Sequence, residues 1–175
     1  MDKKKTIVVT IFILFFCLTS LFSRPWVFGY KIGIEGYNAT GYEKSEYWPI
    51  EVTANLLPKT LYSPTLHAGI IVAQRAANEK AFMNFGLSAP LFVWHNHPLK
   101  NNFRRDSALI PKIDISIDVA FNAPSVKSFS LMAEPFNFYF GDKQVSVLGF
   151  KWLFDPQFEA LGWAVKLFSI NHFIY

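Results

Sequence analysis

Residues 111–122 read P-K-I-D-I-S-I-D-V-A-F-N, and their apolar and polar side chains alternate strictly. Side chains of a β-strand point to opposite faces with a period of two residues. One face is therefore wholly apolar from Ile113 to Phe121, while the other carries one lysine and two aspartates. A strand of about nine such residues can cross a bilayer when it is tilted. The same pattern also suits a soluble antiparallel sheet whose apolar face is turned inward.

The alternation recurs along the chain and predicts about eight strands. We expect them at residues 26–37, 47–57, 65–74, 81–94, 111–122, 126–140, 144–154 and from 159 to the end, with turn-forming residues between them. The apolar side changes parity at Glu134-Pro135. Because proline cannot donate to a strand ladder, this change predicts a bulge within the sixth strand. No stretch with a helical period competes with this all-β assignment.

Two alternatives remain for the apolar face. It lines the inside of a soluble barrel or sandwich, or it faces lipid on the outside of a membrane barrel. Glycines concentrate on the polar face, where a narrow interior needs space. Tryptophans at positions 26, 48, 94 and 163 lie near expected strand ends, as in the aromatic girdles of membrane barrels. These features favour the membrane barrel.

In this pattern, and with an aromatic residue at its end, the chain from residue 26 to 175 resembles the bacterial eight-stranded outer-membrane barrels of the OmpA membrane-domain and OmpX type. The resemblance implies an antiparallel up-and-down transmembrane β-barrel in the bacterial outer membrane. It implies outer-membrane lipids, with lipopolysaccharide as a candidate, and the barrel-assembly machinery as partners. It also implies that Phe173 and Tyr175 form the assembly signal; both share the odd parity of Trp163 and Leu167. The long segment 95–107 departs from the family, because strand alternation places it on the periplasmic side.

The N-terminal segment predicts export. Three lysines precede an apolar run from Thr6 to Phe22, so residues 1–23 are expected to be a signal peptide, with a retained anchor as the alternative, and residues 24–175 the barrel. Removal of residues 1–23 leaves a formal charge of +2 and no cysteine. That charge gives no reason to expect nucleic-acid binding, and stability must come without disulfides.

The polar face carries charges of both signs, which predicts an ion-pair network in the lumen. Its expected members are Lys31, Glu35, Glu51, Lys112, Asp114, Asp118, Glu134, Lys151 and Lys166. We expect Asp114 and Asp118 to pair with Lys112 and Lys31. Since eight strands enclose a space that side chains just fill, the network is expected to plug the barrel. An ion or proton path is the alternative.

Sites for other chemistry are weakly indicated. His95 and His97 share one side of an extended segment with Asp106 nearby, but a polar loop is the favoured interpretation and no metal is expected. Basic residues of the same loop could touch lipid phosphates, although a solvated loop is favoured; they are Lys100, Arg104 and Arg105. No H-x-S pattern or cofactor motif is present. We therefore expect no cofactor and no enzymatic activity.

The sequence thus predicts a non-enzymatic outer-membrane barrel with a structural or interaction role and a plugged lumen. The alternative is a narrow pore or lateral-gate transporter for small hydrophobic compounds. A lipid-modifying enzyme is less favoured, and the oligomeric state stays open.

Overall fold

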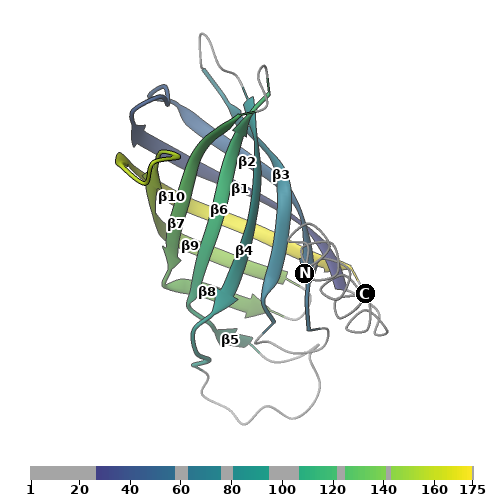
Figure 1. Ribbon diagram of the computed structural model, residues 1–175. Coiled ribbons are helices and arrows are strands. Elements are labelled where there is room, and N and C mark those ends of the chain that lie inside the picture. Colours follow the sequence, from purple (N-terminus) through teal and green to yellow (C-terminus); the bar gives the residue numbers. More distant parts are fainter. Residues whose placement is uncertain are drawn as a thin grey trace, which may run out of the picture.

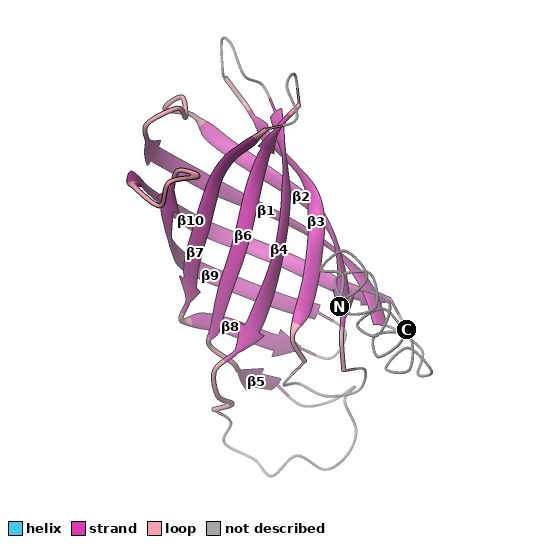
Figure 2. Cartoon of the chain, viewed as in Figure 1, coloured by secondary structure: helices cyan, strands magenta, loops and turns pink. Residues whose placement is uncertain are grey.

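The computed structural model describes residues 27–57, 63–75, 81–94, 107–121, 125–140 and 143–174, and these residues form strands joined by turns (Figures 1 and 2). The strands are β1 (Val27–Ala39), β2 (Glu46–Asn55), β3 (Thr65–Ala73), β4 (Ala81–Pro90), β5 (Ser107–Leu109), β6 (Lys112–Ala120), β7 (Val126–Glu134), β8 (Phe136–Phe140), β9 (Lys143–Phe154) and β10 (Ala160–Ile174). Among the described residues, no helix is long and apolar enough to cross a membrane.

The strands close into an eight-stranded antiparallel up-and-down barrel, which confirms the predicted fold. β10 pairs with both β1 and β9, and this pairing closes the wall. β7 and β8 follow each other along β9 in one register and therefore count as one strand of the wall. β5, which the sequence did not predict, pairs with β8, and β6 then pairs with β7, so β5 and β6 also count as one strand of the wall.

The barrel has two distinct ends. β1 begins and β10 ends at the same end, here called the terminal end, and the turns that follow β1, β3, β6 and β9 lie at the other, the loop end (Figure 1). β4 runs toward the terminal end, so the chain leaves the wall there before residues 95–106, which lie outside the described residues.

Bulges keep the polar side chains inside the barrel. The predicted switch is confirmed, because Glu134 and Asn137 are both buried although they differ in parity. The register places Pro135 opposite Leu148, whose φ of 59° is unusual for a leucine, and Leu148 opposite Leu167. Three neighbouring strands thus carry one extra residue at the same level. Beyond that level all three have exchanged the parity of their inner and outer faces.

This exchange corrects the expected position of Phe173. The sequence placed Phe173 on the face of Trp163 and Leu167, which are 50% and 54% exposed. Phe173 is instead only 2% exposed, because the bulge at Leu167 turns the following odd-numbered residues inward. Its expected role in assembly stays a prediction, and Tyr175 lies outside the described residues.

Candidate functional site

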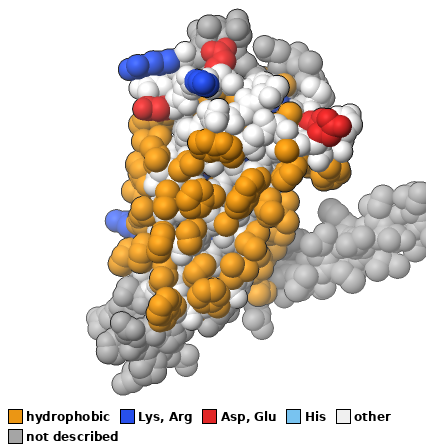
Figure 3. Space-filling model, turned by 90° about the vertical axis from the view of Figure 1, so that its left-hand side faces the viewer, with side chains coloured by type: hydrophobic (Ala, Val, Ile, Leu, Met, Phe, Trp, Pro, Cys, Tyr) orange, Lys and Arg blue, Asp and Glu red, His pale blue; other side chains and the backbone are white. Residues whose placement is uncertain are grey.

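The outer wall carries many exposed apolar side chains, here called the apolar belt, and Figure 3 shows them on one face of the barrel. Its exposed members include Phe28, Ile32, Ile50, Val52, Leu66, Phe85, Leu87, Ile115, Leu131, Phe150, Trp152, Leu167 and Ile170. Within the described strands, the exposed charged residues are Glu46 and Lys143, and each is the first residue of its strand. The side of the barrel that meets its surroundings is therefore apolar except at its rims.

The inner wall has the opposite character. The predicted network residues all point inward; Lys31 retains 11% of its side-chain exposure, and the other eight residues are buried. Hydroxyl and amide side chains fill the space between the charges; among them are Thr53, Asn84, Ser116, Ser128, Ser130, Asn137, Gln144 and Asn171. An isolated charge in such an interior is costly, so the contacts of each charged group decide whether the arrangement is stable.

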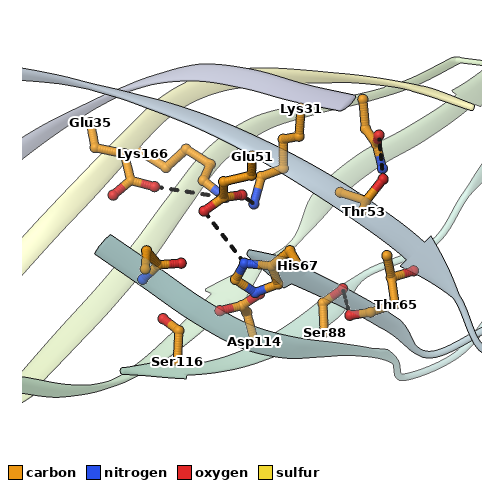
Figure 4. A network of polar contacts seen from close by, with 12 residues as sticks. Lys31, Glu35, Glu51, Thr53, Thr65, His67, Ser88, Asp114, Ser116 and Lys166 are labelled. Carbon is orange, nitrogen blue, oxygen red and sulfur yellow. Dashed lines mark hydrogen bonds and ion pairs between the residues drawn. The ribbon is translucent and has the colours of Figure 1, made fainter. Parts of the chain in front are cut away.

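One part of the network joins four strands through a histidine (Figure 4). Lys31 and Glu51 are register partners on β1 and β2, and their ammonium and carboxylate groups lie 2.7 Å apart. His67 on β3 lies between two carboxylates, with Nδ1 3.4 Å from Glu51 and Nε2 2.7 Å from Asp114 on β6. Gly86 makes room for the imidazole, because a Cβ there would overlap it. His67 therefore bridges two acidic groups.

A second part is centred on Lys166, which is fully buried. Its Nζ lies 2.6 Å from Glu134 and 3.9 Å from Glu35. Glu35 also lies 3.6 Å from Nζ of Lys151, and Lys151 donates a hydrogen bond of 2.9 Å to Tyr37 Oη. Two lysines thus share two carboxylates in a chain of contacts across the lumen.

The expected lysine partners of the two aspartates are wrong. Asp114 contacts His67, as described above, and Asp118 accepts hydrogen bonds from Tyr42 (2.7 Å), Asn84 (2.7 Å) and Ser128 (3.1 Å). Lys112 instead donates to Gln144 Oε1 at 3.3 Å. Neutral hydrogen-bond donors, rather than a lysine, thus contact Asp118.

Among the charged network residues of the described inner wall, carboxylates outnumber ammonium groups by one. These residues carry five carboxylates, on Glu35, Glu51, Asp114, Asp118 and Glu134, and four ammonium groups, on Lys31, Lys112, Lys151 and Lys166. A proton on His67, next to two of the carboxylates, makes the two counts equal. His67 was not among the expected members of the network, although it alternates onto the polar face of its strand.

Apolar layers cover the charged layer at both ends. The loop-end cluster comprises Tyr37, Tyr42, Tyr47, Ile71, Ala73, Phe82, Leu153 and Ala164. The terminal-end cluster comprises Val27, Ala108, Ile110, Tyr139 and Phe173. Between them, a small cavity of about 10 Å³ lies beside His67 and Lys112 and has room for about one water molecule.

Tyr42 is the member of the loop-end cluster that is hardest to predict from the sequence. It comes from the turn after β1, stacks on Tyr37 with ring centroids 4.8 Å apart, and reaches the buried Asp118. Gly41, with a φ of 80°, precedes it and gives the turn its left-handed bend. No pattern in the sequence places the side chain of a turn residue inside the barrel.

The structure does not test the other candidate residues. His95, His97, Asp106, Lys100, Arg104 and Arg105 lie outside the described residues. In the part of the chain that the structure describes, no group of three or more histidine, cysteine, aspartate or glutamate side chains could hold a metal ion.

Comparison of the chain with protein-family models, with curated proteins and with solved structures gave no match. The function must therefore be inferred from the barrel itself.

Proposed function

We propose that this chain is a small bacterial outer-membrane β-barrel with a structural or interaction role, whose lumen is plugged by its own side chains. The observation that carries the proposal is the inverted distribution of polarity: ionic groups are buried, while isoleucine, phenylalanine and tryptophan side chains are exposed around the wall. A soluble protein rarely exposes a contiguous apolar area of more than a few hundred Å². A closed barrel with an apolar exterior supports residence in lipid.

The plugged lumen supports a structural role over transport. An ion crossing the barrel would have to displace the aromatic rings at each end and break contacts such as that between Lys166 and Glu134. The pore and the lateral gate remain the competing hypotheses. His67 is engaged by two carboxylates, which supports a role in the plug rather than in catalysis.

The proposal implies specific surroundings. Outer-membrane lipids would cover the apolar belt, and the barrel-assembly machinery would insert it. Lipopolysaccharide is a further candidate partner at the loop end, where the exposed residues Lys44 and Arg75 line a surface hollow together with Glu46.

Fractionation of a Gram-negative host that expresses the full chain tests residence in the membrane. We expect the protein in the outer-membrane fraction, and we expect the unheated protein to migrate faster in detergent gels than the heated protein. The reason is that a closed barrel keeps its strand hydrogen bonds in detergent until it is heated. Recovery in the soluble periplasmic fraction, or migration that heating does not change, would contradict the proposal.

A further inference from the structure

Tyr42 closes the loop end from a turn, whereas its neighbours close it from strands. Within the described residues, every other member of the loop-end cluster lies in β1, β2, β3, β4, β9 or β10. A strand residue cannot leave the lumen without breaking the wall, but a turn can open locally. Gly41 precedes Tyr42 with a φ of 80°, and no atom of the described residues lies within 4 Å of the place where its Cβ would be. The chain is therefore free to bend at Gly41.

The side chain of Tyr42 contacts a buried carboxylate with its hydroxyl and an ammonium group with the face of its ring. Its Oη donates to Asp118 Oδ2 at 2.7 Å. Nζ of Lys127 lies 4.2 Å from the centroid of the Tyr42 ring and 5.2 Å from that of Phe82. Lys127 is the additional residue of a bulge in β7, next to Ser128, and Ser128 is the register partner of Asp118. The lysine thus reaches the loop-end cluster from a position beside the carboxylate.

This placement of Lys127 gives Asp118 a second source of a hydrogen bond. Asp118 is fully buried, so outward movement of Tyr42 would take one donor from a carboxylate inside the barrel. Loss of a donor from a buried charged group is costly. The flexible side chain of Lys127 can bring its ammonium group to Asp118 as the phenol leaves, which offsets this cost. The turn therefore has two arrangements in which the carboxylate is satisfied.

We propose that Tyr42 is a swinging lid. It alternates between the closed position described above and an open position in which Lys127 replaces it at Asp118. This inference goes beyond the proposed function and depends on the geometry of the barrel, not on residence in lipid. In the open position, water reaches Asp118 from the loop end. The open lid does not make a pore, because the terminal-end cluster stays in place.

The reaction of buried cysteines with a water-soluble methanethiosulfonate reagent tests the lid in the folded full-length protein. Cys17→Ser gives a background without thiols, since Cys17 is the one cysteine of the sequence. Ser128→Cys places a reporter beneath the lid, because Ser128 Oγ lies 2.6 Å from Tyr42 Oη. Ser130→Cys places a control two residues further along the same buried face of β7. We expect the thiol at 128 to react on the order of tenfold faster than the thiol at 130, because local opening needs less free energy than opening of the wall.

Two substitutions should change the rate at position 128 in opposite directions. Tyr42→Phe keeps the ring but loses the hydrogen bond to Asp118, so the thiol should react about tenfold faster. Lys127→Met removes the replacement donor, so the thiol should react about fivefold more slowly. Lys127→Arg retains a charged donor and should keep the fast reaction.

The sign of the Lys127 effect separates the lid from simple packing. A lysine that only packs on the ring of Tyr42 would stabilise the closed position. Faster reaction in Lys127→Met would therefore overturn the proposal. Equal rates at positions 128 and 130 would show that the barrel opens as a whole, and would overturn it as well. Asn84→Cys, which lies beside Asp118 on β4, supplies the reporter should Ser128→Cys fail to fold.

Discussion

Replacing Lys166 by methionine should lower the free energy of unfolding by about 3–5 kcal/mol, the usual effect of removing one partner from a buried ion pair. Lys166 is fully buried and lies 2.6 Å from Glu134 and 3.9 Å from Glu35. Methionine keeps most of the length of the side chain but leaves two carboxylates with less positive charge near them. Urea unfolding from lipid vesicles measures the loss.

A double-mutant cycle measures the interaction between Lys166 and Glu134 separately from the effect of losing the lysine. Lys166→Met combined with Glu134→Gln should recover part of the loss, so that a double-mutant cycle gives a coupling of about 0.5–3 kcal/mol. Lys44→Met removes an exposed lysine and should change stability by about 0.5 kcal/mol or less. Additive effects of the two lumen substitutions would mean that Lys166 and Glu134 are separately hydrated, and would revive the ion path.

Replacing Ile115 by arginine should impair insertion and lower stability by about 2–4 kcal/mol in vesicles, the cost of a basic residue on the lipid face at the middle of the bilayer. Ile115 lies in the middle of β6 and is 60% exposed. If the same face met water, a charge there would be tolerated or would even improve solubility. The substitution therefore has opposite consequences under the two interpretations of the apolar belt.

A matched substitution near the end of the barrel, away from the middle of the bilayer, provides the control. Val126 is exposed on the first residue of β7, near the loop end, so Val126→Arg should have an effect of about 0–1 kcal/mol. Equal losses from the two substitutions would indicate a defect in the wall rather than a lipid environment. Normal folding of Ile115→Arg in vesicles would reject the membrane assignment.

Period-two alternation correctly predicted which residues face inward where no unmarked bulge intervenes. Lys112, Asp114 and Asp118 are buried and Ile115 is exposed, as the strand pattern required. Pro135 indicated one bulge, because proline cannot donate a strand hydrogen bond. No comparable residue indicates the bulges at Leu148 and Leu167. The face of Phe173 was therefore misassigned, because each unmarked bulge reverses the faces of all following residues in its strand.

Ion-pair partners were harder to predict than faces. Lys31 meets Glu51 through the register of one hairpin, but the contact of Asp118 with Tyr42 joins residues 76 positions apart in the sequence. Such contacts depend on how the barrel closes and on how a turn bends into the lumen. The alternation of side chains predicts neither of these. The sequence therefore predicted that the lumen is charged, but it did not predict which groups contact each charge.

Electrical recording across a planar lipid bilayer tests the plugged lumen most directly. With the folded full-length protein inserted, as verified by the heat-dependent gel shift, the account predicts no resolved conductance steps at moderate voltage, because aromatic layers cover a filled charged interior. Discrete, reproducible conductance steps from the inserted wild-type protein would contradict that prediction and show that the barrel is a pore.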